Sequence, residues 1–250
     1  GNIIMILIEK SSFRSVKIML YQHGTLGTLM AGLLEGTATI NEILEHGDLG
    51  IGTLTGSDGE VIILDNQAFH ANEFGEFKEL NGDELTPFAT VTPFKPDHQF
   101  DVRNITDSET LLNKVQQKAL SDNIFIAVKI TGKFEMVHVR MMPKQEKPYT
   151  RLIESAKRQP EFTHEQIDGT IVGFYAPELF HGIAASGFHL HFVDDHKSVG
   201  GHVLDFEMNH GTVELSNIET LEQHFPVNNQ TFLEADIDYT NVEEDIKEAE

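Results

Sequence analysis

The sequence contains no cysteine. This absence excludes disulfides, thiolate nucleophiles, iron–sulfur clusters and thiolate-ligated zinc, so only histidine and carboxylate side chains could hold a metal ion. Positive charge is also scarce, because 18 Lys and Arg stand against 40 Asp and Glu, which gives a formal net charge of -22. Such a surface repels a phosphate backbone and an anionic membrane, so we expect neither nucleic acid nor a membrane as a partner. A small anionic substrate would need a local cation at its site.

Long apolar runs are missing as well. The strongest apolar run near the start covers residues 3–8, which is too short for a membrane span, and its basic residues follow it rather than precede it as in a signal peptide. We therefore interpret residues 1–16 as a leader extension outside the folded part, and we expect a cytoplasmic location.

Short strands outnumber helices along the rest of the chain. Apolar residues at helical spacing, with capping residues or glycine at the ends, predict helices over residues 25–34, 40–44, 107–120 and 149–157. Strands are predicted over residues 49–54, 61–64, 88–94, 124–130, 136–142, 171–175, 182–193, 201–208 and 212–215, with 124–130 and 136–142 as paired neighbours.

This order favours an α+β fold over a doubly wound parallel sheet. We expect two strand-rich domains with mixed, barrel-like sheets and a few helices. The Lys-Pro-Asp sequence at residues 95–97 breaks any strand and is the best boundary. It divides the chain into an N-terminal domain, residues 17–97, and a C-terminal domain, residues 98–250, which ends in an acidic tail over residues 236–250.

Histidines are densest between residues 187 and 202. On a strand, His189 and His191 point to the same face with Cα atoms about 6.6 Å apart, which is close enough to share a metal ion. His202 follows a glycine pair and can return on the next strand, opposite the first two. Three histidines with an open fourth position are typical of catalytic zinc. A chain with 13 histidines has on the order of 0.7 His-x-His pairs by chance, so spacing alone leaves ordinary core histidines open as the alternative.

Several separated motifs resemble bacterial acetolactate decarboxylases. They are Gly-Phe-His-Leu-His-Phe-Val-Asp at 187–194, Gly-Gly-His-Val at 200–203, Gly-Asp-Leu-Gly-Ile-Gly-Thr at 47–53, Glu-Lys-Pro-Tyr at 146–149 and Gly-Thr-Ile-Val-Gly-Phe at 169–174. They occur in the order seen in that family, and the resemblance runs from about Tyr21 to the end of the sequence. It implies a cytosolic enzyme that converts 2-acetolactate to acetoin and carbon dioxide.

The resemblance also implies a zinc ion and its ligands, which fall on His189, His191 and His202. The active-site arginine of the family falls on Arg140, and the active-site glutamate falls on Glu60. Thr53 and Arg140 are the implied contacts to the substrate. A second glutamate comes from the tail, where either Glu250 or Glu248 could fill the role, and we prefer Glu250.

These residues suggest a mechanism. In 2-acetolactate the carboxylate is β to a ketone, so zinc could polarise the ketone as a Lewis acid and stabilise the charge left when carbon dioxide departs. Arg140 would bind the substrate carboxylate or a developing oxyanion. Glu60 and the tail glutamate would then move protons.

Two other classes use similar patterns. The His-x-His and Gly-Gly-His motifs also resemble a small binding domain of plants and prokaryotes, some members of which accompany DNA-binding segments, although the negative charge argues against that function. A cupin-type metalloenzyme is the other alternative, but its acidic ligand would have to be Asp194 or Asp195, which match poorly.

Besides the substrate 2-acetolactate, we expect a second copy of the chain as a partner, in a homodimer.

Overall fold

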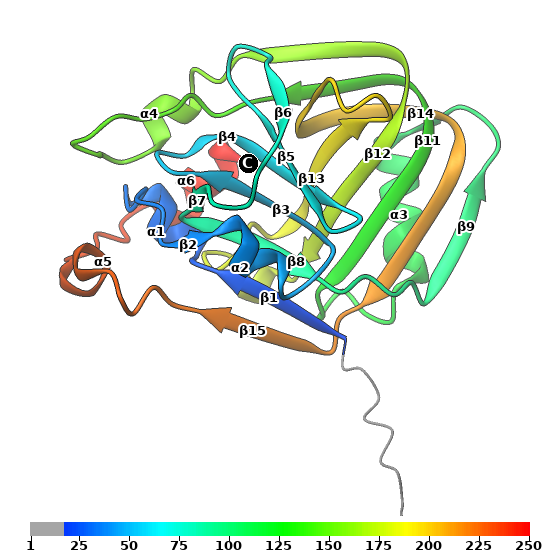
Figure 1. Cartoon of the computed structure of the whole chain (residues 1–250). Coiled ribbons are helices and arrows are strands. Elements are labelled where there is room, and N and C mark those ends of the chain that lie inside the picture. The colour runs from blue at the N-terminus through cyan, green and yellow to red at the C-terminus, as the bar shows by residue number, and fades with distance from the viewer. Residues whose placement is uncertain (1–17) are drawn as a thin grey trace, which may run out of the picture.

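The structure is a computed structural model that describes residues 18–250, so the leader expected for residues 1–16 lies outside the described residues. Two large sheets pack face to face, and short helices lie around them (Figure 1). Strands dominate and helices are few, which confirms the predicted α+β class. None of the helices in residues 18–250 is long and apolar enough to cross a membrane.

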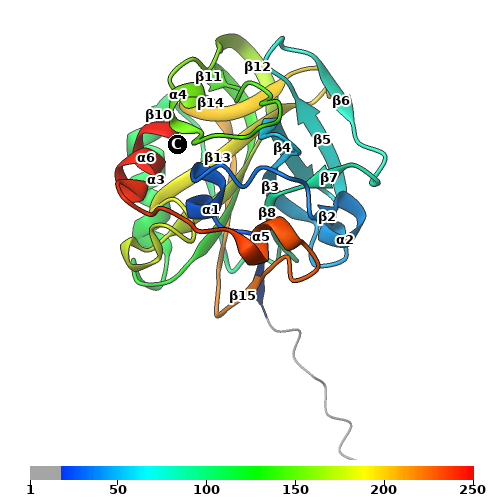
Figure 2. The same cartoon turned by 90° about the vertical axis from the view of Figure 1, so that its left-hand side faces the viewer.

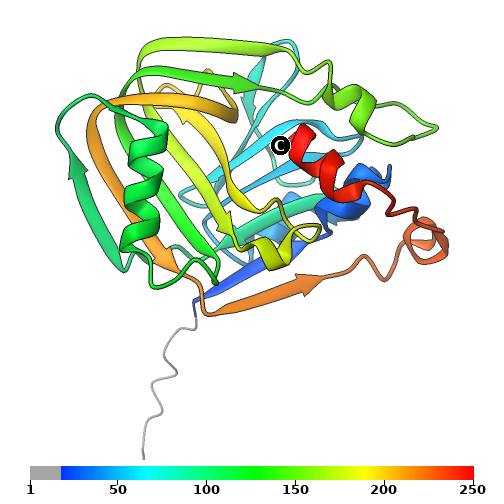
Figure 3. The same ribbon diagram turned by 180° about the vertical axis from the view of Figure 1, so that it is seen from behind.

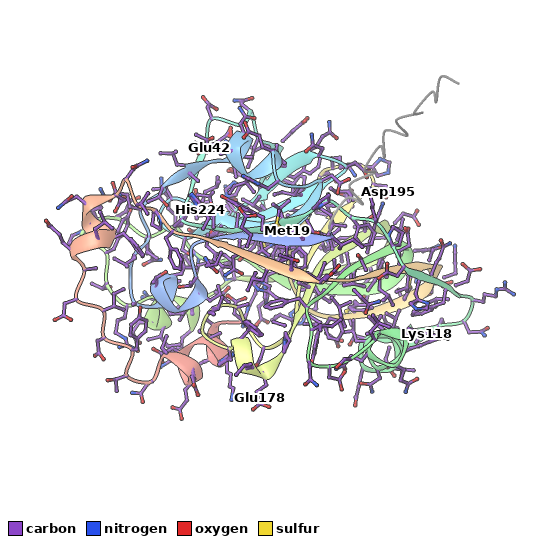
Figure 4. The ribbon with its side chains drawn as sticks, turned by 90° about the horizontal axis from the view of Figure 1, so that it is seen from below. Met19, Glu42, Lys118, Glu178, Asp195 and His224 are labelled. Atoms are coloured by element: carbon purple, nitrogen blue, oxygen red, sulfur yellow. The ribbon has the colours of Figure 1, made fainter. Side chains whose placement is uncertain are left out.

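The first sheet has seven strands in the order β15-β1-β8-β3-β4-β5-β6. Their bounds are β1 Met19–His23, β3 Leu49–Leu54, β4 Asp58–Leu64, β5 Gln67–Ala71, β6 Phe77–Glu79, β8 Phe88–Thr92 and β15 Thr220–His224. The strands predicted over residues 49–54 and 61–64 are present as β3 and β4, and they pair as an antiparallel hairpin. Every neighbouring pair is antiparallel except β1 and β15, which run parallel along one edge (Figure 4).

The second sheet has six strands and closes on itself at one end. Its strands are β9 His98–Val102, β10 Thr106–Asp107, β11 Ile126–Arg140, β12 Glu161–Ala176, β13 Gly187–Asp194 and β14 Gly200–Asn217. The order β14-β11-β12-β13 is completed by pairing of β13 with the start of β14. The closed end agrees with the expected barrel-like character, and it holds the histidine-rich motif. Two short strands, β2 Ala38–Thr39 and β7 Leu85–Thr86, pair separately.

Three strands of the second sheet are much longer than predicted. The segments expected as a pair, residues 124–130 and 136–142, are parts of the single strand β11, and 201–208 and 212–215 are parts of β14. The predicted pairing of the first two segments is therefore wrong. The chain does not turn between these segments, and the strands approach closely there because Gly132 lies opposite both Gly169 and Gly211 in the register. A Cβ on Gly211 would lie 2.1 Å from the Thr131 carbonyl oxygen.

The helices are short and lie around the sheets, and the longest of them, at residues 108–118, lies against the long strands of the second sheet (Figures 2 and 3). Their bounds are α1 Leu26–Met30, α2 Ile40–Leu44, α3 Ser108–Lys118, α4 Ile153–Ala156, the 3-10 turn η1 Glu178–Phe180, α5 Gln230–Glu234 and α6 Val242–Ala249. The Asp107 side chain caps α3 as predicted, by accepting from the Thr110 N–H. The helices at 25–34 and 149–157 are shorter than predicted, since only residues 26–30 and 153–156 are helical.

The two sheets share one core. Leu49, Ile51 and Ile62 of the first sheet pack in one buried cluster with Ala127 and Val172 of the second. A second cluster fills the space between the long strands and α3. The division into domains at residue 97 stays a prediction, and β15 is the segment after residue 97 that returns to the first sheet.

Candidate active site

The three predicted histidines meet at the closed end of the second sheet. His191 lies directly opposite His202 in the register of β13 and β14, and His189 lies two residues earlier on the same face of β13. The ring centroids are 5.0 to 5.6 Å apart. One ring nitrogen from each histidine lies within 4.8 Å of the others, so the three can share one metal ion.

The hydrogen bonds of His191 fix which of its nitrogens faces this group. Its Nδ1 lies 2.8 Å from the Val61 carbonyl oxygen, which can only accept, so Nδ1 carries the proton. Burial, together with the neighbouring imidazoles of His189 and His202, holds the pKa of His191 well below its usual value. The Nε2 atom of the neutral ring is then a buried acceptor, and it has no hydrogen-bond partner within residues 18–250. A lone pair left in this way suits a cation.

Glu60 faces the same lone pair from the first sheet. It lies on β4, is 7% exposed, and accepts the Met142 N–H at 3.0 Å through Oε1. Its Oε2 lies 3.3 Å from His191 Nε2. Burial raises the pKa of Glu60 well above its usual value, and the negative charge of Glu250 adds to this shift. Two acceptors that face each other at this distance require a proton or a metal ion between them.

The acidic tail ends in the site through α6. Glu250 Oε2 lies 3.0 Å from His189 Nε2 and 3.6 Å from His202 Nδ1. Burial raises the pKa of Glu250, but the adjacent imidazoles, His189 above all, outweigh it and leave this pKa below its usual value. Glu248, the alternative, is on the exposed side of α6, with its carboxylate 4.0 Å from Lys157. The structure therefore brings Glu250 to the histidines, and it leaves Glu248 outside.

His202 and Arg140 are held beside the tail. Burial lowers the pKa of His202 to about 4, although the charge of Glu250 opposes the shift. Its Nε2 lies 3.0 Å from a main-chain oxygen of Glu250, so Nε2 donates and the lone pair of Nδ1 points toward the cluster. Arg140 lies opposite His202 on β11, and its Nη2 donates to the Ala249 carbonyl oxygen. Its Nε is buried without a partner within residues 18–250, so it still has a hydrogen bond to give.

These groups surround a small cavity of about 30 Å3, which has room for about two water molecules. Thr53 lies on its wall, and its hydroxyl donates to the Gly59 carbonyl oxygen at 2.8 Å. The Thr53 hydroxyl oxygen can therefore still accept a hydrogen bond. The apolar part of the wall is formed by Leu26, Leu29, Phe88, Met142 and Leu152. Every residue that we expected at the site lines this cavity or, as Arg140 does, contacts a residue of its wall.

Sequence patterns missed the atoms that support the site. The Val61 carbonyl and the Met142 N–H are main-chain groups, and a sequence carries no signal for them. The amide of Gln159, which donates to the Ala249 carbonyl oxygen at 3.2 Å, also gave no signal, because it contributes to the site only after the tail has folded back.

Comparisons with known proteins agree with this geometry. The family model described as alpha-acetolactate decarboxylase matches residues 20–239. The alpha-acetolactate decarboxylase of Lactococcus lactis subsp. cremoris is 46% identical over 92% of this chain and 98% of its own length, and that of Streptococcus thermophilus is 42% identical over 94% and 100%.

Solved structures give the same result. A Staphylococcus aureus protein, described as similar to alpha-acetolactate decarboxylase, is 60% identical with a TM-score of 0.91, over 93% of this chain and 100% of its own. The alpha-acetolactate decarboxylase of Bacillus subtilis is 34% identical with a TM-score of 0.89, over 93% and 99%. These matches span nearly the whole described chain, including both sheets and the histidine motif. The chain therefore belongs to the alpha-acetolactate decarboxylase family of carboxy-lyases.

Proposed function

We propose that the protein decarboxylates 2-acetolactate to acetoin and carbon dioxide at the three-histidine site, with zinc as the bound metal. Membership of the family supports the reaction. The observation that carries the metal is the buried, unpartnered Nε2 of His191, which faces the Glu60 carboxylate within a group of three convergent imidazoles.

Zinc fits the donor set of this chain. The site offers imidazole nitrogens and carboxylate oxygens but no thiolate, and catalytic zinc is commonly held by three protein ligands with a further position open. When bound, the ion supplies a Lewis acid that polarises the substrate ketone. His189, His191 and His202 would hold it, and the Val61 carbonyl would fix the orientation of His191.

The reaction requires three contributions from the protein. The bond between the carboxylate carbon and the adjacent carbon breaks, and the electron pair stays on the four-carbon fragment. A proton is finally added to the carbon that carried the carboxylate. The charge that develops on the fragment must therefore be stabilised, the leaving carboxylate must be oriented, and a proton must be delivered from one side.

Particular side chains suit these tasks. Arg140, with its unpartnered Nε, would bind the substrate carboxylate, and the Thr53 oxygen would accept a hydrogen bond from the substrate hydroxyl. Glu60 contacts His191 and Glu250 contacts His189, and both would carry protons at their Oε2 atoms. The leucines of α1 exclude water from this side of the cavity, so that the electrostatic contacts are strong.

Metal analysis combined with an acetoin assay tests the proposal. We expect one zinc ion per chain and production of acetoin from 2-acetolactate. His189→Ala should lose both the metal and the activity, whereas His210→Ala, which removes an exposed histidine from β14, should retain both. A His189→Ala protein with stoichiometric metal and full activity would show that the site is elsewhere.

Two broader predictions accompany this function. We expect the protein in the cytoplasm, which fractionation of the source cells tests. We also expect a homodimer, which light scattering of the purified protein tests.

A further inference from the structure

The tail that delivers Glu250 is itself strongly acidic. Residues 236–250 contain seven Asp and Glu against one Lys, and the chain as a whole has a net charge of -22. Docking such a segment against such a body is opposed by charge repulsion. Some positive group on the body must therefore hold the tail in place.

Arg151 is placed to do this. It lies just before α4, and its Nη2 donates to the Asp245 carboxylate and, at 3.0 Å, to the Thr240 carbonyl oxygen. Its Nη1 lies 3.7 Å from Asp238 Oδ2. One guanidinium thus contacts the approach to α6 and its first turn, and the Asp245 side chain is only 13% exposed in this pair. A planar fork can make such contacts together, whereas a point charge cannot.

Apolar contacts fix the other side of α6. Ile246 and Ala249 are buried in the cluster that contains Leu26, Leu29 and Leu152. His181 adds a directed contact, because its Nδ1 accepts the Ser186 N–H and its Nε2 therefore donates to the Glu243 carbonyl oxygen at 2.8 Å. The apolar face supplies adhesion, but such contacts are non-directional and leave the rotation of the helix weakly specified.

The rotation and height of α6 decide where Glu250 lies. Glu250 follows Asp245 by five positions, which corresponds to about 7.5 Å along a helix. A shift of α6 at its Arg151 end would therefore move the carboxylate that lies 3.0 Å from His189. The same shift would move Ala249, whose carbonyl oxygen accepts from Arg140.

We propose that Arg151 is a positioning residue that holds α6 through Asp245, so that Glu250 reaches His189 and Arg140 stays oriented. The effect on turnover rests on the proposed function, whereas the effect on the position of the tail does not. Lys157 makes a weaker contact with the tail, since its Nζ lies 4.0 Å from the exposed Glu248.

Hydrogen exchange of the full-length protein tests the position of the tail. Arg151→Gln should raise the exchange rate of the amides of residues 242–250 at least tenfold, and Asp245→Asn should do the same from the other side of the contact. Arg158→Gln removes an exposed arginine from the same segment and should leave the tail as it is in the wild type. Unchanged exchange in both Arg151→Gln and Asp245→Asn would overturn the proposal.

A double-mutant cycle with Glu250 separates positioning from general stability. Arg151→Gln should lower kcat about tenfold with a smaller change in KM, and Arg151→Lys should recover part of the loss. In a Glu250→Gln background, Arg151→Gln should have a clearly smaller effect, because only its influence on Arg140 remains. Equal losses in both backgrounds would show that Arg151 does not act through Glu250. A wild-type protein that makes no acetoin would refute the proposed function, while the exchange measurement would still decide the role of Arg151.

Discussion

Replacing Glu60 with glutamine should stabilise the metal-free protein while it abolishes activity. The change exchanges one carboxylate oxygen for an amide nitrogen of nearly the same size. Oε1 can keep the Met142 N–H at 3.0 Å, which places the new amide where Oε2 now lies, 3.3 Å from His191 Nε2. Because Nδ1 of His191 already donates to Val61, Nε2 accepts, and the amide N–H would satisfy it.

In the metal-free wild type, Glu60 must either take up a proton or leave His191 Nε2 as a buried polar group without a partner, and the amide removes this cost. Satisfying such a group is worth about 1–3 kcal/mol. In a protein of this length 1 kcal/mol shifts the melting temperature by about 2–4 °C, so the metal-free variant should melt about 2–12 °C above the metal-free wild type. The amide cannot carry a proton, so turnover should fall at least about a hundredfold. The metal should also bind less tightly, since the amide competes for the lone pair of His191.

Calorimetry on chelator-treated protein measures the first effect, and an acetoin assay after reloading with zinc measures the second. Glu165→Gln, an exposed glutamate on β12, is the matched control and should change neither. A metal-free Glu60→Gln protein that melts at or below the wild-type temperature would refute the assignment of the His191 proton. Wild-type turnover would refute a proton-carrying role for Glu60.

Three further changes have defined outcomes. Arg140→Lys keeps the charge but loses the planar fork, so the rate should fall tenfold or more with an unchanged circular dichroism spectrum; wild-type steady-state kinetics would make Arg140 structural. Gly211→Ala places a Cβ 2.1 Å from the Thr131 carbonyl oxygen and should cost about 3 kcal/mol in urea denaturation, and an unchanged midpoint would mean that the strands separate easily. Burial raises the pKa of Asp194, but N–H groups led by that of Val199 outweigh it and lower this pKa below its usual value. The carboxylate therefore contributes stability that is fully present above its unfolded-state pKa, about 4, and is lost as the pH falls through the folded value. Asp194→Asn should lose about 1.5–3 kcal/mol at neutral pH and show a weaker acid dependence in calorimetry, and parallel pH profiles for the two proteins would contradict this.

The histidine site could be predicted because it depends on local geometry. Alternation along a strand places His189 and His191 on one face, and the glycine-containing turn fixes the return of His202. Glu60 and Arg140 are different, since no local pattern connects them to the histidines. They were found through the resemblance, and only the packing of β4 and β11 against the site explains why these residues are there.

Tertiary packing decided what the sequence could not predict. Glycine is common in turns, yet Gly132 and Gly211 each lie inside a long strand. They face each other there, and the missing side chains allow the two backbones to approach closely. The tail gave two candidates, and the choice depended on which side of α6 is buried. Ile246 is buried and Glu250 follows it by four residues, on the same side of the helix, whereas Glu248 lies away from it.

The parallel pair of β1 and β15 also has a consequence for synthesis of the chain. His23 and His224, which face each other in this pair, are 201 positions apart. At about 5–20 residues per second, a ribosome needs about 10–40 s to make the chain between them. During that time the edge of β1 that pairs with β15 has no partner from its own chain, and such an edge readily pairs with other chains. We therefore expect soluble yield in a cell to depend on how well this edge of β1 is protected by chaperones until β15 has been made.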